Sequence, residues 1–460
     1  MARAQAKSYS IDMCSGPILP KLLRFTVPLM CSSILQLLFN TADIIVVGRF
    51  AGDNSLAAVG STSALINLLV NLFMGLSIGA NILAARHFGA REDEELHKTV
   101  HTAILISIVS GLIITVVGVA GARVILELMQ SPPDVLDLAV LYLRIYFLGM
   151  TSTMLYNFGA ALLRAAGDTQ RPLYYLSAAG VVNVVLNLFF VIVLHMDVAG
   201  VALATIIAQT ISALLVLRCL MRETGGIHLD LRRLKIYPPK FKQILQMGLP
   251  AGLQGVLFSL SNVVIQSSVN SFGEIIVAGS SAASSVENFV YVSMNAFHQA
   301  NVSFTSQNLG AGKYRRIWRI LLLAEICVVV VGATMGGAVW FFGPQLLRLY
   351  TTSDAVIEAA MVRLGIVCLP YALCGIMDVA VGTLRGIGHS VLPMIVTLVG
   401  ACGLRLVWIA TIFQLPAYHK IQTVYWSYPI SWVITAFAHF ICIFWAMKRL
   451  KRHLGPEHTS

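Results

Sequence analysis

The stretch LRAAGDTQRP at residues 163–172 returns as LRGIGHSVLP at residues 384–393, an offset of 221 residues. The Leu-Arg pair, the Gly at the fifth position and the Pro at the tenth fall in register. Upstream, Pro28 recurs at almost the same offset as Pro250. A duplicated apolar chain is typical of transporters that are built from two repeats around a central site.

Apolar residues dominate the composition and place the chain in a membrane. Of the 460 residues, 57% are hydrophobic and only 12% are charged. Runs of roughly 20 apolar residues, each long enough to cross a bilayer core, follow one another almost without pause. Every backbone polar group must be satisfied within such a run, so each run is predicted to be helical. The sequence predicts twelve spans, at 22–47, 56–80, 99–122, 136–158, 172–195, 198–220, 243–270, 275–303, 317–342, 356–382, 391–414 and 424–447.

Charge placement predicts the orientation of the chain. The net charge is +11, but with the N-terminus inside, the cytoplasmic segments hold 25 of the 32 Lys and Arg residues, and the outer loops hold 4. This bias follows the positive-inside rule and predicts that both termini are cytoplasmic. The membrane topology therefore accounts for the excess of positive charge, and we expect no nucleic-acid partner. The first apolar run is too long for a signal peptide and is expected to remain as the first span.

One basic linker separates two halves of the chain. We expect an N-terminal six-helix lobe at 1–220, a cytoplasmic linker at 221–242, a C-terminal six-helix lobe at 243–450 and a cytoplasmic tail at 451–460. Because each half holds an even number of helices, both halves enter from the cytoplasm and the repeats are parallel. The predicted class is therefore an all-α polytopic membrane protein with twelve transmembrane helices in two parallel six-helix repeats.

Among the polar residues in the predicted spans, Asp43 is the one whose position in the membrane most requires an explanation. A central Asp costs about 2.5–3.5 kcal/mol on insertion scales, and Asp43 lies six residues, roughly 9 Å, before the outer end of its helix. Asn183, Asn187 and Thr205 are expected at similar depth on the fifth and sixth helices. Oxygen ligands of this kind suit a small cation, and a desolvated Asp can instead hold a proton. Packing between helices by hydrogen-bonded Asn and Thr is the alternative.

Further polar stripes predict a wet substrate cavity. Asn and Gln recur at helical spacing on the first, second, seventh and eighth helices, and Glu287 falls near the middle of the eighth. Facing inward, these stripes would line a cavity; helix packing is again the alternative. The predicted cavity residues are Gln36, Asn40, Asn67, Asn71, Asn262, Gln266, Glu287, Asn288, Tyr291 and Asn295.

The remaining charged residues within helices are expected to be mainly structural. This applies to Glu325, Arg144, Arg363 and Arg405, whereas Asp378 is left open between a structural and a functional role. No HExxH, paired-Cys or Gly-rich phosphate motif appears, so we expect no enzyme activity, no cofactor and no metal beyond a Na⁺ ion at Asp43.

Several segments resemble the multidrug and toxic compound extrusion (MATE) family. They are NTADIIVVG at 40–48, QNLGAGK at 307–313 and LRGIG at 384–388. Together with the twelve helices and the central linker, the resemblance covers nearly the whole chain. The resemblance is to bacterial, NorM-like or DinF-like members, and it implies that Asp43, Asn183, Asn187 and Thr205 match the family's cation site.

The chain also departs from that pattern. Position 187 is Asn here, whereas some members, the DinF-type branch among them, carry Asp. NorM-type members carry an acidic residue in the seventh helix, but residues 249–270 contain none. Their acid in the tenth helix lies about one turn earlier than Asp378.

The resemblance implies secondary active efflux of organic, often cationic, compounds in exchange for Na⁺ or H⁺ by alternating access. Small organic molecules and the lipid bilayer of the cell inner (plasma) membrane are the expected partners, and we expect a monomer. The alternative is a flippase for lipid-linked oligosaccharides or lipids from the same MOP superfamily. A membrane-embedded enzyme would need a His/Asp cluster near one interface, and a passive channel would not need two Pro-bearing repeats with a buried acid.

Overall fold

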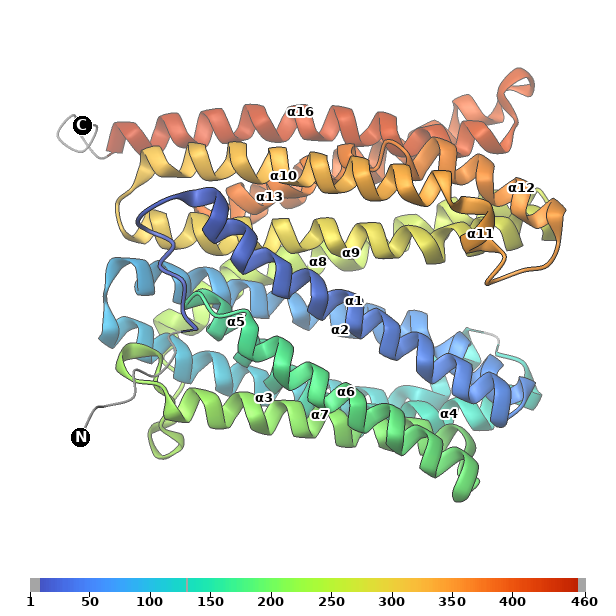
Figure 1. Ribbon diagram of the computed structural model, residues 1–460, viewed down its shortest axis with the longest axis horizontal. Coiled ribbons are helices and arrows are strands. Elements are labelled where there is room, and N and C mark those ends of the chain that lie inside the picture. The colour runs from blue at the N-terminus through green and yellow to red at the C-terminus, as the bar shows by residue number, and fades with distance from the viewer. Residues whose placement is uncertain (1–8, 130, 454–460) are drawn as a thin grey trace. The chain divides into compact units, whose positions relative to one another are not determined.

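The computed structural model describes residues 9–129 and 131–453, and the regular elements within these ranges are all helices (Figure 1). Most of the tail expected at 451–460 lies outside the described residues. Ten helices are long and apolar enough to cross a membrane, and two bent helix pairs bring the number to twelve. The predicted all-helical class is therefore confirmed.

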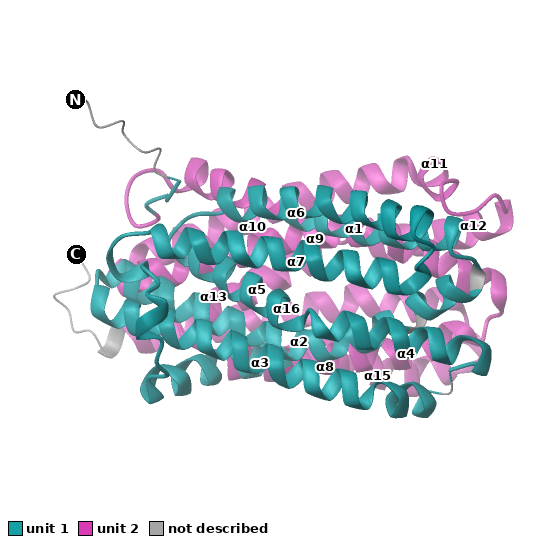
Figure 2. Ribbon diagram, turned by 90° about the horizontal axis from the view of Figure 1, so that it is seen from below, with its two compact units in different colours: residues 1–12, 31–252 teal, residues 13–30, 253–460 magenta. Residues whose placement is uncertain are grey.

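The chain folds into two compact units, coloured separately in Figure 2. Unit 1 comprises residues 1–12 and 31–252, and unit 2 comprises residues 13–30 and 253–460. Two helices pass from one unit to the other: α1 (Ile18–Phe50) between residues 30 and 31, and α8 (Pro238–Asn270) between residues 252 and 253. The six-helix lobes expected at 1–220 and 243–450 were defined by the sequence repeat, whereas the two units are defined by packing. The units therefore do not test the lobes, which remain a prediction.

Helices of unit 1 pack around a core of Ala, Val, Leu and Ile side chains. They are α2 (Asp53–Ala90), α3 (Asp93–Leu128), α4 (Pro133–Leu148), α5 (Met150–Ala165), α6 (Gln170–Leu188), the π-helical turn η1 (Phe189–Val193), α7 (Asp197–Arg222) and the 3-10 turns η2 (Gly225–Ile227) and η3 (Leu231–Arg233).

Unit 2 has a core that is richer in aromatic side chains. Its helices are α9 (Glu274–Gly310), α10 (Tyr314–Phe341), α11 (Gly343–Leu347), α12 (Asp354–Arg363), η4 (Leu364–Cys368), α13 (Ala372–Gly386), α14 (Val391–Thr397), η5 (Leu398–Gly403), α15 (Leu404–Ala410), η6 (Ile412–Gln414), η7 (Pro416–Tyr418) and α16 (Ile421–His453). Of these, η4 and η5 are π-helical, and η6 and η7 are 3-10 turns.

Two of the predicted spans are broken helices. The run predicted at 136–158 is the pair α4 and α5, which meet at Gly149 with a bend of 46°. The run predicted at 356–382 comprises α12 with η4, followed by α13, with a bend of 42°. Pro370 lies in the second break, and proline lacks the backbone donor that a continuous helix needs at that place. Apolar runs predict that a segment crosses the membrane, but they carry no signal for such bends.

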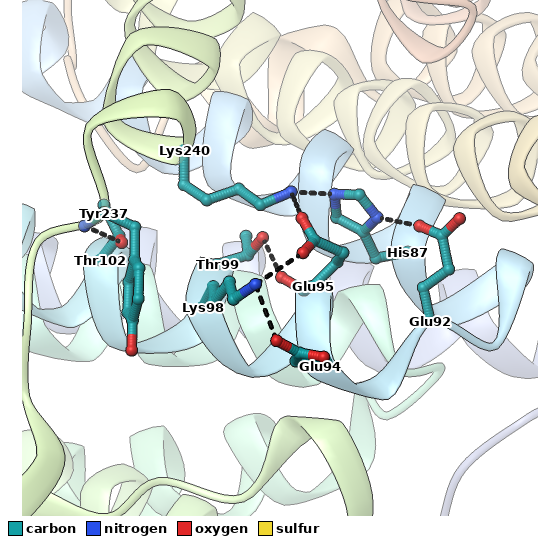
Figure 3. Close-up of polar contacts among 9 residues, drawn as sticks. All are labelled: His87, Glu92, Glu94, Glu95, Lys98, Thr99, Thr102, Tyr237 and Lys240. Carbon is teal, nitrogen blue, oxygen red and sulfur yellow. Dashed lines mark hydrogen bonds and ion pairs between the residues drawn. The ribbon is translucent and has the colours of Figure 1, made fainter.

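A polar network fixes the start of α8 on unit 1 (Figure 3). Lys240 Nζ donates to Glu95 Oε2 at 2.6 Å and to His87 Nε2 at 2.8 Å, which ties α8 to both α3 and α2. Just before α8, the Tyr237 backbone N–H donates to Thr102 Oγ1 at 3.1 Å. Lys240 is buried, so its charge is compensated within the network. The first half of α8 therefore belongs to unit 1 by direct contacts.

Backbone-to-backbone packing between α2 and α8 completes this attachment. A Cβ added at Gly75 would lie 2.1 Å from the Gly252 nitrogen, and one added at Gly252 would lie 2.1 Å from the Leu72 carbonyl oxygen. Gly79 and Gly248 meet backbone atoms of the facing helix in the same way. Small residues allow such close approach of membrane helices.

We expect Gly75→Ala to lower stability by about 1–3 kcal/mol, because its methyl group would collide with backbone atoms that cannot rotate away. Gly60→Ala on the same helix is the matched control, since no atom lies within 4 Å of its added Cβ. Alanine is favoured over glycine in a helix by about 1 kcal/mol, so the control should be neutral or stabilising. Thermal unfolding of the purified variants in detergent measures both; equal shifts would contradict the close packing.

Candidate functional site

Phe39 of α1 packs directly against Gly180 of α6 in unit 1. A Cβ at Gly180 would lie 1.8 Å from the Phe39 ring, so this ring occupies the space that any larger residue would need. Asp43 lies one turn beyond Phe39 on α1, and Asn183 and Asn187 lie one and two turns beyond Gly180 on α6. The same contact therefore places Asp43 beside the two amides.

Hydrogen bonds join the four residues that the sequence predicted as a cation site. Asn187 Nδ2 donates to Asp43 Oδ1, and Thr205 Oγ1 on α7 donates to Asp43 Oδ2 at 3.4 Å. Asn183 connects the other two, donating to Thr205 Oγ1 at 3.4 Å and accepting from Asn187 at 3.3 Å. Both asparagines are buried.

One oxygen of this cluster has no partner. Asn187 Oδ1 is buried and accepts no hydrogen bond from the described residues. A buried acceptor without a donor is costly, and it is the kind of atom that a bound cation or a proton-bearing group would satisfy. Carboxylate, amide and hydroxyl oxygens are ligands for hard cations. Among the described residues no group of three His, Cys, Asp or Glu side chains could hold a metal.

Two tyrosines of α4 belong to the surroundings of this site and were missed by sequence reasoning. The charge of Asp43 acts on both Tyr142 and Tyr146, whose ring centroids lie 5.8 Å apart. Their i, i+4 spacing was the available signal, but tyrosine pairs are common in helices and did not indicate that α4 faces Asp43.

The predicted cavity residues are distributed over both units. In unit 1 the side chains of Gln36, Asn40, Asn67 and Asn71 are exposed. In unit 2 Asn262, Asn288 and Tyr291 are exposed, and Gln266 and Asn295 are half-buried. Several of them pair along their own helix: Gln266 donates to Asn270 at 2.9 Å, and Gln299 donates to Asn295 at 3.0 Å.

Glu287 differs from the other predicted cavity residues because it is buried in an ion pair. It is 3% exposed, and its carboxylate accepts from Arg363 Nε at 3.1 Å and Nη2 at 3.0 Å. Arg363 Nη1 also donates to Ser280 Oγ at 2.9 Å. Both carboxylate oxygens of Glu287 therefore already accept hydrogen bonds from the guanidinium of Arg363 on α12.

Other charged residues of unit 2 lie within its helix bundle, outside the Glu287–Arg363 pair. Arg385 donates to Gln254 Oε1 at 2.8 Å, and His298 Nδ1 lies 2.6 Å from the Asp378 carbonyl oxygen. Both carboxylate oxygens of Glu325 are buried without a hydrogen-bond partner among the described residues. Asp378 and Arg385, both on α13, form no ion pair with each other within the described residues.

Taken together, the helices, the repeat and an acid hydrogen-bonded to a buried amide define a polytopic membrane protein of transporter type. The profile of the MatE family matches residues 28–189 and 250–411, once in each half of the chain. The chain belongs to the MatE family. The two matches also confirm the internal repeat.

Relatives and solved structures agree with this assignment. The chain is 26% identical over 420 residues to the Probable multidrug resistance protein YoeA of Bacillus subtilis, covering 89% of this chain and 90% of that protein. It is 22% identical over 393 residues to the Probable multidrug resistance protein NorM of Thermotoga maritima, covering 84% of each. A crystal structure of MATE in complex with MaL6 is similar with a TM-score of 0.90 and 23% identity, covering 97% of this chain and all of that one. The resemblance to the bacterial MATE family is confirmed.

Proposed function

We propose that this protein is a secondary active multidrug exporter that expels organic, often cationic, compounds in antiport with Na⁺ or H⁺ by alternating access. It acts as a monomer in the plasma membrane, with both termini in the cytoplasm. Support for the substrate class comes from the relatives, whose names describe multidrug resistance. The observation that carries the antiport is the hydrogen-bonded cluster around Asp43, in which the buried Asn187 oxygen has no partner among the described residues.

In this proposal Asp43 holds the coupling ion. Binding of Na⁺ or H⁺ from outside would compensate the carboxylate charge and favour the state that releases substrate. Substrate that enters from the cytoplasm or the inner leaflet would favour the opposite state. One charge moving through 100 mV supplies about 2.3 kcal/mol, so one or two ions support a useful substrate gradient.

The predicted cavity residues other than Glu287 are proposed to contact substrate. Those of unit 1 are Gln36, Asn40, Asn67 and Asn71; those of unit 2 are Asn262, Gln266, Asn288, Tyr291 and Asn295. Amide side chains can accept and donate hydrogen bonds without fixing one charge, which suits a broad range of compounds.

Ethidium efflux from proteoliposomes tests the proposal. We expect efflux above that of protein-free liposomes under an imposed Na⁺ gradient or an imposed H⁺ gradient, with the effective gradient naming the ion. Efflux that is equal with and without each gradient would contradict antiport. Absence of efflux from correctly inserted protein would favour the lipid flippase, to be followed with a fluorescent lipid.

A further inference from the structure

A histidine at the end of α2 holds the first turn of α8 by a contact that only its neutral form can make (Figure 3). His87 Nδ1 lies 2.6 Å from Glu92 Oε2, and its Nε2 lies 2.8 Å from Lys240 Nζ. A lysine ammonium has donors and no acceptor, so Nε2 must accept. The single ring proton is then on Nδ1, where it is donated to Glu92. The contacts therefore define both the charge and the tautomer of His87.

Among the described residues, three charged side chains from three different segments act on His87. They are Glu92 from the turn before α3, Glu95 from α3 and Lys240 from α8. The side chain of His87 is 12% exposed and that of Lys240 is 6% exposed, whereas that of Glu92 is 52% exposed. Water therefore screens the charge of Glu92 more strongly than the charge of Lys240.

Glu95 cannot compensate a further positive charge, because two lysines already share it. Its Oε2 accepts from Lys240 at 2.6 Å, and its Oε1 accepts from Lys98 at 2.9 Å. Glu94, which also accepts from Lys98, is 83% exposed. A proton on His87 would place a second positive charge 2.8 Å from Lys240 Nζ and would turn the acceptor Nε2 into a donor. Protonation of the ring and its contact with Lys240 therefore exclude each other.

A second histidine of the same attachment tolerates either charge. His101 Nδ1 lies 2.8 Å from the His97 carbonyl oxygen, and its Nε2 lies 3.1 Å from both the backbone nitrogen and the carbonyl oxygen of Asp230. Neutral His101 accepts from the Asp230 N–H, and protonated His101 can donate to the Asp230 carbonyl oxygen instead. Of these two histidines, only His87 is therefore tied to one charge state.

The Lys240 contact lies at the end of a helix pair whose backbones touch. A Cβ at Gly79 of α2 would lie 2.8 Å from the Gly248 nitrogen of α8. His87 follows Gly79 by eight residues, and Lys240 precedes Gly248 by eight residues. Because α2 and α8 run in opposite directions, the polar contact continues the same line of packing toward the start of α8. Loss of this contact would leave the start of α8 held by its polar contacts to α3.

We propose that His87 is a proton-operated switch for α8: uptake of a proton displaces Lys240 from the ring and loosens the first half of α8 from α2. Histidine ordinarily changes its charge between about pH 5 and pH 8. The topology under the proposed function places the α2–α3 turn in the cytoplasm, so the switch responds to cytoplasmic acid. It goes beyond the proposed function, which gives this end of unit 1 no role. Because α8 continues into unit 2, the switch acts on a helix that both units share.

Hydrogen–deuterium exchange, read by mass spectrometry on the purified full-length protein in detergent, measures the opening of residues 238–252. The protection factor, which is the exchange rate of the free peptide divided by that in the protein, cancels the intrinsic effect of pH. In His87→Gln the amide oxygen can still accept from Lys240 but takes up no proton. We expect equal protection of the wild type and this variant at pH 8. At pH 5 the wild type should be less protected by at least about tenfold, because it has lost a hydrogen bond of a charged group.

Two further variants separate the switch from a general effect of acid. His195→Gln applies the same substitution to an exposed histidine of unit 1 and should follow the wild type at both values of pH. In Lys240→Met the contact is absent from the start, so protection of residues 238–252 should be equally low at pH 8 and pH 5. A Lys240→Met protein that is protected like the wild type at pH 8 overturns the switch.

Glu92→Gln decides if His87→Gln does not fold or is unprotected at pH 8. Its glutamine can still accept from His87 Nδ1, but protonated His87 loses its counter-ion, so protection at pH 5 should exceed that of the wild type. Equal protection of wild type and His87→Gln at pH 5 overturns the switch, as does equal protection of wild type and Glu92→Gln in the deciding case. The exchange measurement needs no transport, so the switch and the proposed export can each fail without the other.

Discussion

The Asp43→Asn protein should insert and fold like the wild type, yet its ion-driven efflux should fall to the background of protein-free liposomes. Asparagine has the size of aspartate: its oxygen can still accept from Asn187, and its amide nitrogen can donate to Thr205 Oγ1, whose own hydrogen can go to the Val201 carbonyl oxygen at 3.0 Å, so the packing of α1, α6 and α7 is kept. It carries no charge and exchanges no proton, so it cannot respond to the gradient. Initial rates of ethidium efflux under Na⁺ and H⁺ gradients measure the effect.

The control for this prediction applies the same substitution at an exposed position. Asp137 on α4 is 84% exposed and contacts Arg123 at 3.5 Å, a surface pair that contributes little. Asp137→Asn should therefore export at the wild-type rate. Normal gradient-driven export by Asp43→Asn would remove Asp43 from the coupling step.

The Glu287→Gln protein should lose about 3–5 kcal/mol of stability, because the substitution leaves the Arg363 charge buried without its partner. The double variant Glu287→Leu with Arg363→Met removes both charges and should be close to the wild type or more stable. Thermal unfolding of the purified proteins in detergent compares them. Glu358→Gln on α12 is the control, since that glutamate is exposed.

The same variants decide whether Glu287 contacts substrate, as predicted from its place in the eighth span. If the ion pair is structural, Glu287→Gln loses stability, and the double variant restores both stability and transport. If Glu287→Gln were as stable as the wild type but bound cationic dye more weakly, the carboxylate would have to act on the dye directly, and the ion pair would be of minor importance.

The helices and the polar cluster around Asp43 could be predicted from the sequence for physical reasons. Long apolar runs can satisfy their backbone only as helices, so their number and order were predictable. Asn183 and Asn187 share a helix face because they are four residues apart, and Asp43 has a similar depth when counted from the same end of the bundle. Depth and face together were enough to predict that these side chains meet.

The pairing of Glu287 with Arg363 could not be predicted in this way from helix face and depth. The two residues are separated by 76 positions, and their contact depends on how α9 and α12 are rotated about their own axes. Apolar periodicity sets that rotation weakly where helices are apolar on all sides.

The exchange of α1 and α8 between the units has a consequence for biosynthesis. Residues 13–30 are synthesised long before residues 253–460, yet both belong to unit 2, where Asn308 donates to the Met13 carbonyl oxygen across 295 positions of sequence. Unit 1 in turn lacks its segment 238–252 until more than half of the chain has been made. Neither unit can therefore be completed before translation of the second half is under way, so membrane insertion must keep the first segment accessible until its partners are synthesised.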